Sequence, residues 1–444
     1  MGAFKAYDIR GTYPDEVNED LAYKVGRNLP SLLGGRRALV GRDARLSSPA
    51  MADAVIRGIA DAGCDVDDMG LASTPMAYFA TAAKGYDFSV QVTASHNPAD
   101  CNGLKISAAG ARPVGHDTGL GELERLVAEP LPTPTAAKGI VREVSHIGDF
   151  IAFLRGWLPD LAGMRLAVDC SDGMASLVVR ELFGDAPSYV ASRPDGRFPS
   201  HAPNPFEPAG RMLIVDTVRK TGADAGVVFD GDADRMMLID EHGDFVRPDL
   251  MIAIMARRFL RDNPGAAILH DIRTSRGVTE ILREEGARPV MWKVGHAFAK
   301  VRMREENAAF GGELAGHYYF RDFFWCDSGE LAALVALGEI ARARNEGGMA
   351  LSALAASVNR YANTGELNFR IDDKAAAMER LRQHFVSKRE PTAFFDFDGY
   401  RIEYPEWWFN VRPSNTEPYL RLIIEARTEE MLAERRAEME SLLR

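Results

Sequence analysis

One unit recurs three times along the chain and constrains its fold more than any other feature: a short apolar run ending in aspartate, a turn, and a stretch of helical spacing. The three aspartates are Asp43, Asp169 and Asp271, which are separated by 126 and 102 residues. Another apolar run follows each helical stretch. Strand–helix–strand units of this kind build mostly parallel sheets that are covered by helices. The sequence therefore predicts three related α/β domains of about 100 to 150 residues each.

The pattern changes toward the C-terminus. Short apolar runs and helical segments alternate there at 367–371, 374–385, 399–404, 407–411, 419–426 and 428–443. This order is typical of an α+β unit with an antiparallel sheet. We therefore expect four domains around a central cleft. They are three α/β domains with mixed, mostly parallel sheets at 1–147, 148–247 and 248–362, and an α+β domain at 363–444.

Composition excludes several classes of protein. The net charge is −11 and no dense basic run occurs, so we expect no nucleic-acid partner. No run of about 18 apolar residues predicts a membrane span, and the N-terminus lacks a secretory pattern. We therefore expect a cytoplasmic protein. Its cysteines, which show no paired spacing, are expected to be reduced thiols: Cys64, Cys101, Cys170 and Cys326.

The first loop that can carry chemistry is the segment 93–98 (TASHNP), which follows the apolar strand 88–92. Pro98 keeps the residue before it out of helical geometry, so Ser95 is expected in an exposed turn. A serine placed in this way can cap a helix or act as a nucleophile. The Gly-x-Ser-x-Gly pattern is missing, which excludes an α/β-hydrolase. Lys105 brings a cation into the same region.

The second loop carries three alternating carboxylates, Asp230, Asp232 and Asp234, directly after an apolar strand. Carboxylates this close repel one another unless a cation joins them, and their oxygens suit a hard divalent ion, Mg²⁺ first. An EF-hand loop is the obvious alternative, because Glu241 falls at its twelfth position. Its sixth position, which requires glycine, is Arg235 instead. A solvated acidic turn stays open as an alternative to a metal site.

The third loop is the glycine-rich segment 311–317 (GGELAGH). Glycines let the backbone approach a ligand closely. Glu313 and His317 supply groups that can hold sugar hydroxyls or move a proton. His296 lies in a Gly-His pair not far upstream. Taken alone, the segment could equally be a glycine-rich turn.

The fourth loop is the segment 412–418 (RPSNTEP) between two apolar strands. A guanidinium combined with hydroxyl, amide and backbone donors makes a suitable cradle for a phosphate group. Arg421 adds a second cation a few residues later. A polar hairpin turn is the alternative reading of this loop alone.

The placement of the loops says more than any one of them. Each repeated unit carries one loop, 42 to 61 residues after its aspartate, and the last domain carries the phosphate loop. Loops at the strand ends of neighbouring α/β domains can converge on one cleft. A nucleophile, a metal site, a sugar-binding loop and a phosphate-binding loop together indicate phosphoryl transfer on a phosphosugar.

The four loops, in this order, resemble the signature motifs of the α-D-phosphohexomutases. The segments 4–11 (FKAYDIRG) and 316–322 (GHYYFRD) resemble the bacterial phosphomannomutase/phosphoglucomutase branch of that family, and the likeness spans residues 4 to about 426. It implies a four-domain enzyme with a central cleft. Such an enzyme interconverts hexose 1-phosphate and hexose 6-phosphate (mannose and/or glucose) through a phosphoserine and a hexose 1,6-bisphosphate. The implied cofactors are Mg²⁺ and, as activator, glucose 1,6-bisphosphate.

The resemblance also implies roles for individual residues. The phosphoserine would be Ser95, which would join the three aspartates as a metal ligand: Asp230, Asp232 and Asp234. Positions assigned to general acid/base or charge-stabilising roles match Arg10, Lys105 and His317. Positions that contact the substrate or its phosphate match Tyr7, Arg235, Arg273, His296, Glu313, Arg412, Ser414, Asn415, Thr416 and Arg421.

Two residues depart from the family pattern, and both concern sugar recognition. Ala315 stands where many relatives carry Ser, and Arg273 stands where the family often has Lys, which is not a neutral exchange. Two other functions stay open: a phosphoglucosamine mutase of the same superfamily, or a phosphosugar phosphatase in which water takes the phosphoryl group from Ser95. We expect a monomer or weak dimer whose partner is a phosphosugar, with no nucleic acid and no membrane.

Overall fold

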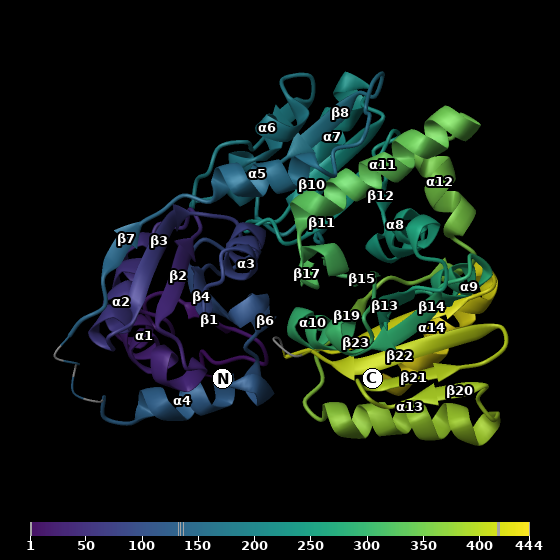
Figure 1. Ribbon diagram of the computed structural model, residues 1–444. Coiled ribbons are helices and arrows are strands. Elements are labelled where there is room, and N and C mark those ends of the chain that lie inside the picture. The colour runs from purple at the N-terminus through teal and green to yellow at the C-terminus, as the bar shows by residue number, and fades with distance from the viewer. Residues whose placement is uncertain (1, 132, 134, 136, 415–417, 444) are drawn as a thin grey trace.

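The computed structural model describes residues 2–131, 133, 135, 137–414 and 418–443. Within this part of the chain, four sheets follow one another, each with its own helices (Figure 1). The first three sheets mix parallel and antiparallel pairs, and the fourth is antiparallel throughout. The predicted architecture of three α/β domains followed by an α+β domain is confirmed. The exact residues at which the chain divides stay a prediction.

The first domain has a sheet of order β1-β5-β4-β2-β3-β7, with β6 paired to β5. Its strands are β1 (Ile9–Thr12), β2 (Arg37–Arg42), β3 (Asp65–Leu71), β4 (Phe88–Val92), β5 (Cys101–Ala108), β6 (Arg112–Pro113) and β7 (Val141–Glu143). Its helices are α1 (Glu19–Leu33), α2 (Ser48–Asp61), α3 (Thr74–Ala83) and α4 (Leu120–Ala128).

The second domain has the strand order β12-β11-β10-β8-β9. Its strands are β8 (Leu166–Asp169), β9 (Ser188–Val190), β10 (Ala225–Phe229), β11 (Met236–Asp240) and β12 (Phe245–Val246). The helices of this part are α5 (Ile147–Arg155), α6 (Val179–Phe183) and α7 (Met212–Thr221).

The third domain has the strand order β14-β13-β15-β16-β17. Its strands are β13 (Ala267–Asp271), β14 (Arg288–Trp292), β15 (Phe310–Gly312), β16 (Tyr318–Phe320) and β17 (Cys326–Asp327). Its helices are α8 (Pro248–Asp262), α9 (Arg276–Glu284), α10 (His296–Glu305), α11 (Gly329–Gly347) and α12 (Leu351–Val358).

The fourth domain has the strand order β18-β23-β22-β21-β20, with β19 paired to β23. Its strands are β18 (Ala362–Asn363), β19 (Leu367–Phe369), β20 (Ala393–Phe395), β21 (Tyr400–Glu403), β22 (Trp407–Pro413) and β23 (Leu420–Ala426). Its helices are α13 (Lys374–Lys388) and α14 (Glu429–Leu443).

The repeated unit of the sequence occupies the same place in each of the first three sheets. Its strands, β2, β8 and β13, each lie between two parallel neighbours. The chemically interesting loops leave the carboxyl end of one of those neighbours: β4 for Ser95, β10 for Asp230 and β15 for Glu313. Ligands of open α/β sheets bind outside the carboxyl ends of the strands. The repeat thus places one functional loop at the carboxyl-end edge of each of the first three sheets.

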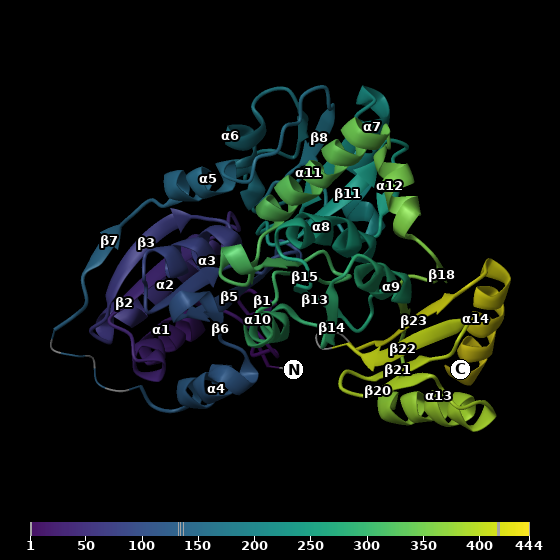
Figure 2. The ribbon, with the colours of Figure 1, turned by 45° about the vertical axis from the view of Figure 1, so that its right-hand side comes forward.

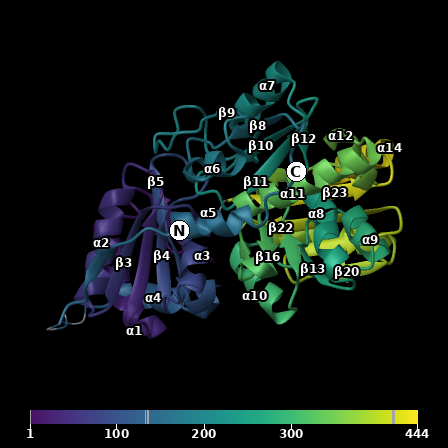
Figure 3. The same ribbon diagram turned by 45° about the horizontal axis from the view of Figure 1, so that its top comes forward.

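The apolar core shows how the domains are joined. One continuous buried cluster runs from α3 and α5 through the second and third domains and includes Phe79, Phe150, Val227 and Phe310. The C-terminal domain packs around a core of its own. Figure 2 shows this yellow domain as a separate body beside the third domain, and Figure 3 shows it opposite the purple first domain. A small apolar cluster, in which Leu314 packs on Trp408 and Ile423, joins the fourth domain to the third.

The cysteines are all free and buried. None of the helices in the described ranges is both long and apolar enough to cross a membrane.

Candidate active site

The serine loop is buried, which corrects the expectation of an exposed turn. Ser95 is 1% exposed and has a positive φ of 52°. The carboxylate loop of the second domain covers it so closely that a Cβ added to Gly231 would lie 2.7 Å from the Ser95 carbonyl oxygen. The hydroxyl of Ser95 donates to Oδ2 of Asp230 at 3.0 Å. Sequence reasoning missed this burial because it treated the loop apart from the domain that packs on it.

His96 is a second neighbour of the serine hydroxyl. Its Nδ1 lies 3.2 Å from the Ser95 Oγ. Burial, and then the charge of Arg235, lower the pKa of His96 well below its ordinary value, so the imidazole is neutral. A neutral ring beside the hydroxyl leaves the positive charges of the site on lysine and arginine.

One buried guanidinium, that of Arg45, holds the serine loop in place. It is 1% exposed and donates to four carbonyl oxygens, those of Ser95, Asn97, Pro98 and Cys101. Its charge is balanced by Asp43, whose Oδ2 accepts from Nε at 3.1 Å. The repeated aspartate of the first domain therefore acts through Arg45 on the serine loop. Apart from its position two residues after Asp43, nothing in the sequence marks Arg45 as a site residue.

We expect Arg45→Met to destabilise the protein and to lower turnover. The substitution leaves the carboxylate of Asp43 buried without its partner, which costs about 3–5 kcal/mol in comparable pairs. It also frees the carbonyls that orient Ser95. Urea unfolding would measure the first effect and steady-state kinetics the second. Arg57→Met, an exposed change on α2, is the matched control. A free energy of unfolding equal to that of the wild type would contradict this role.

The metal loop meets the requirements of a cation site. The carboxylates of Asp230, Asp232 and Asp234 are fully buried, and their ligand oxygens lie within 4.8 Å of one another. Oδ1 of Asp232 and Oδ1 of Asp234 have no hydrogen-bond partner among the described residues. Burial and the two neighbouring carboxylates raise the pKa of Asp230 well above its ordinary value. Unsatisfied buried oxygens in a cluster of this kind fit a hard divalent ion.

Two helices from other domains hold this loop by their N-termini. Thr74 at the start of α3 donates its backbone N–H to the Asp232 carbonyl at 3.0 Å, and its hydroxyl to Asp232 Oδ2 at 2.6 Å. Gly329 at the start of α11 donates to the Ala233 carbonyl at 3.0 Å. The partial positive charge of both helix ends therefore faces the acidic loop. The loop lies where the first three domains meet.

Glu330, in the first turn of α11, is a buried acid close to this junction. Its Oε2 accepts from the Ser328 hydroxyl at 3.0 Å, and its Oε1 has no partner within the described ranges. Burial raises its pKa from the ordinary 4.5 to about 8. The carboxyl group is therefore protonated at neutral pH.

This acid should make the stability of the protein fall as the pH rises. Between pH 4.5 and 8 the folded state keeps a proton that the unfolded state has lost. The free energy of unfolding then decreases by up to about 1.4 kcal/mol per pH unit and levels off above the folded pKa. We expect Glu330→Gln to remove this slope and to be more stable than the wild type at the alkaline end. Urea unfolding across the window tests this, and parallel pH profiles would contradict it.

Lys105 places its ammonium on two of the metal-loop carboxylates. Nζ lies 2.6 Å from Asp232 Oδ2 and 2.5 Å from Asp234 Oδ2. Burial lowers the pKa of Lys105, but the two carboxylates outweigh it, and the net pKa lies above its ordinary value. The predicted cation is thus brought to the triad. Asp234 in turn keeps a lowered pKa because Lys105 and His317 outweigh the effect of burial.

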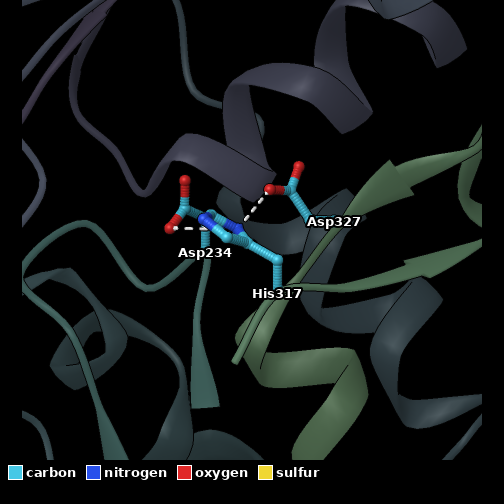
Figure 4. Close-up of side chains that lie close together, drawn as sticks. All are labelled: Asp234, His317 and Asp327. Atoms are coloured by element: carbon cyan, nitrogen blue, oxygen red, sulfur yellow. Dashed lines mark ion pairs between the residues drawn. The ribbon is translucent and has the colours of Figure 1, made fainter. Parts of the chain in front are cut away.

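His317 lies between two aspartates, as Figure 4 shows. Its Nδ1 is 2.7 Å from Asp327 Oδ2 and 3.8 Å from Asp234 Oδ1. Nε2 accepts from the Arg235 Nε–H at 2.9 Å. The spacing of these three side chains would also suit a metal, but the other oxygen of Asp327 already pairs with Lys300 at 2.7 Å. Sequence reasoning missed Asp327; its position in an unremarkable Cys-Asp-Ser-Gly segment gave no signal.

The carboxylate of Glu313 is used within the protein. It is 1% exposed, its Oε1 accepts from the Gly295 N–H at 2.7 Å, and its Oε2 accepts from the Tyr319 hydroxyl at 2.6 Å. The next residue, Leu314, donates its N–H to the repeated aspartate Asp271 at 2.8 Å. The sugar loop is thus held by the aspartate of its own repeat, as the serine loop is.

Arg273 joins the third domain to the fourth. It pairs with Asp271 at 2.7 Å and with Glu366 at 3.2 Å, and Glu366 pairs with Arg421 at 2.8 Å. A guanidinium can serve two carboxylates at once through separate N–H groups, which a lysine ammonium does with less geometric control. Arg273, which stands where the family often has Lys, therefore bridges a carboxylate of the third domain and one of the fourth.

A cavity of about 640 Å³ receives side chains from all four domains. The predicted residues that line it are Tyr7, Arg10, Lys105, Arg235, Arg273, His296, Glu313, His317 and Arg421. Ser95 lies beneath its wall, next to the lining residues His96 and Asn97.

Part of the predicted phosphate loop stands apart from this lining. Arg412 is buried and donates to Asp398 at 3.0 Å rather than lining the cavity. Ser414 donates its backbone N–H to the Tyr419 carbonyl, and Tyr419 does line the cavity. Asn415 and Thr416 lie outside the described residues.

The buried serine donates a hydrogen bond to a triad of carboxylates that suits a metal ion, and lysine and arginine side chains line the cavity beside it. This arrangement defines an enzyme of phosphoryl transfer. Models of the phosphoglucomutase/phosphomannomutase family match nearly the whole chain. They are the alpha/beta/alpha domains I (residues 1–133), II (158–243) and III (247–361), and the C-terminal domain (366–442). The chain belongs to this family and is an intramolecular phosphotransferase.

Proteins with similar sequences or structures match this chain over nearly their whole lengths. A phosphomannomutase of Escherichia coli is 40% identical, with 99% of this chain and 98% of the relative covered. Phosphohexose mutases of Xanthomonas campestris pv. campestris are 38% identical, with 100% and 99% covered. A crystal structure of a phosphoglucomutase/phosphomannomutase family protein from Burkholderia thailandensis matches with a TM-score of 0.89 at 30% identity, covering 99% of this chain and 96% of that one. The family expected from the four motifs is confirmed.

Proposed function

We propose that this enzyme interconverts hexose 1-phosphate and hexose 6-phosphate through a phosphorylated Ser95. The carrying observation is the 3.0 Å hydrogen bond from Ser95 Oγ to Asp230, which places a buried hydroxyl on the metal-type triad beside the cavity. In the first step the bond between phosphorus and Ser95 Oγ breaks as the free sugar hydroxyl bonds to phosphorus, giving a hexose 1,6-bisphosphate. After this turns end for end, Ser95 takes back the other phosphoryl group.

Asp230, Asp232 and Asp234, together with the phosphoserine, would hold Mg²⁺. The bound ion would supply stabilisation of negative charge on the transferring phosphoryl group. Lys105, which already contacts Asp232 and Asp234, adds a second positive charge at the same place.

Nε2 of His317 is a proton acceptor with a defined lone pair. It accepts from Arg235 in this structure, and when Arg235 turns to the phosphoryl group the lone pair becomes available to the attacking hydroxyl. Arg10, 3.0 Å from the Asn97 side chain in the serine loop, would stabilise charge from the opposite wall. The Arg412 loop, Arg421 and the cavity residues Tyr7, His296 and Glu313 would hold the rest of the phosphosugar.

Mannose and glucose phosphates are the substrates we propose, because the relatives similar over the whole chain are named phosphomannomutases and phosphohexose mutases. Glucose 1,6-bisphosphate would act as activator by phosphorylating Ser95. A phosphoglucosamine mutase and a phosphosugar phosphatase are the alternatives that the test must separate. The cytoplasmic location and the monomeric or weakly dimeric state stay predictions.

The test is a coupled mutase assay with Mg²⁺ and a trace of glucose 1,6-bisphosphate. Mannose 1-phosphate, glucose 1-phosphate and glucosamine 1-phosphate are compared by kcat/KM, and free phosphate is measured in parallel. We expect turnover of the first two, little of the third, and no release of phosphate. A preference for glucosamine 1-phosphate would replace the substrate, and phosphate release without isomerisation would replace the function.

A further inference from the structure

A buried lysine outside the proposed machinery contacts one histidine of the cavity wall and the aspartate that lies beside the other. Lys300 on α10 is 1% exposed and follows His296 by one helical turn. Its Nζ lies 3.4 Å from His296 Nδ1, 2.7 Å from Asp327 Oδ1 and 3.8 Å from the centre of the Tyr78 ring. A buried ammonium with three such neighbours is fixed in position.

The contact with His296 determines which ring nitrogen carries the proton. An ammonium can only donate, so Nδ1 of His296 must accept and its proton must lie on Nε2. Burial and the charge of Lys300 lower the pKa of His296 well below its ordinary value, so the ring is neutral. Nε2 has no partner among the described residues, and the ring lines the cavity. This nitrogen therefore presents an N–H to a ligand.

The contact with Asp327 acts on the other histidine. After burial, Lys300 is the largest influence on Asp327 and helps to hold its pKa well below the ordinary value, so the carboxylate is ionised. Its second oxygen lies at ion-pair distance, 2.7 Å, from Nδ1 of His317, without a hydrogen bond between them. Nε2 of His317 accepts from Arg235, whose Nε always carries a proton. His317 therefore holds its proton on Nδ1 and its lone pair on Nε2.

We propose that Lys300 is a positioning residue that fixes the tautomer of His296 opposite to that of its stacked neighbour His317. His296 becomes a donor toward the substrate, and His317 becomes a proton acceptor. The ring centres lie 5.8 Å apart with planes inclined by 26°, so both work on the same part of the cavity. Lys300 contacts the first ring directly, whereas Arg235 fixes the second. This inference rests on the proposed function for its catalytic consequence, whereas the tautomers themselves can be observed without turnover.

The wild-type protein provides the first test. The chain has nine histidines, so long-range ¹H–¹⁵N spectra of histidine-labelled protein are simple enough to assign with His296→Gln and His317→Gln. We expect protonated Nε2 for His296 and protonated Nδ1 for His317. Any other assignment in the wild type overturns the proposal, and this measurement does not depend on a variant that folds.

The second test is Lys300→Met, which keeps the length of the side chain and removes its donors. We expect His296 to populate both tautomers and kcat to fall about 10- to 100-fold, the usual loss when an outer hydrogen-bond partner is removed, with KM changed less. Lys220→Met, an exposed lysine on α7, is the control. Unchanged tautomers and unchanged kcat would overturn the proposal. Failure of the proposed function would look different: the stated tautomers in a wild-type enzyme that isomerises no hexose phosphate.

Discussion

Ser95→Ala is expected to lower mutase turnover by about 10³-fold or more, because the substitution removes the hydroxyl oxygen that would carry the phosphoryl group between the two sugar positions. The change is small and deletes only the contacts of the hydroxyl with Asp230 and His96. The fold and the cavity should therefore survive. The measurement is kcat with hexose 1-phosphate in the presence of activator.

Phosphate transfer to the protein supplies an independent readout of the same variant. Wild-type enzyme incubated with labelled glucose 1,6-bisphosphate should gain one phosphoryl group, and Ser95→Ala should gain none. Ser387→Ala, an exposed serine on α13, is the matched control and should behave as the wild type. Normal turnover of Ser95→Ala, or equal labelling of both proteins, would contradict the nucleophile assignment.

The sequence predicts those parts of the fold that depend on hydrophobic periodicity and on the order of strands and helices along the chain. The three repeated units occupy equivalent central strands, and each functional loop leaves a neighbouring parallel strand. Strand–helix–strand units pair parallel strands within one sheet, so a loop that follows an apolar strand is expected at the carboxyl edge of that sheet. The positions of Ser95, Asp230 and Glu313 at strand ends could therefore be predicted.

What the sequence could not predict arises where separate domains meet. Ser95 is buried by Gly231 of another domain, and no local pattern signals that contact. Arg45 and Lys300 look like ordinary surface cations in the sequence. In the structure Arg45 is buried against the carbonyl of Ser95, and Lys300 is buried against the carboxylate of Asp327. The sequence also does not indicate that both oxygens of Glu313 accept hydrogen bonds within the protein. Such assignments need tertiary distances.

The domain arrangement also gives the repeated aspartates a common explanation. Asp43 acts on the serine loop through Arg45, and Asp271 accepts from the sugar loop at Leu314. In the second domain Asp169 pairs with His201 at 3.0 Å, on a segment whose later residues line the cavity. Each aspartate stands at the carboxyl end of a central strand and fixes a loop that reaches toward the cavity. The repeat is therefore a device for positioning loops, and the chemistry differs with the loop it holds.

The second large effect is expected at the metal loop, where Asp232→Asn should reduce turnover by about 10²- to 10³-fold, the range seen when one element of charge stabilisation is lost. Asp232 Oδ1 has no partner among the described residues and is placed to bind a cation, whereas Oδ2 accepts from Thr74 and Lys105. The amide keeps the shape but has one acceptor oxygen in place of two. It cannot serve Thr74, Lys105 and a metal ion together.

Calorimetric titration with Mg²⁺ and kinetics across Mg²⁺ concentration separate binding from chemistry in this variant. We expect weaker Mg²⁺ binding together with a lower kcat, and wild-type values for Asp216→Asn, an exposed change on α7. A chelator should inactivate the wild type, and added Mg²⁺ should restore it. If the chelated enzyme stayed active, Lys105 would be the cation that serves this loop, since its ammonium already contacts Asp232 and Asp234. The triad would then be a buried ion-pair cluster, and the burden of charge stabilisation would pass to lysine and arginine.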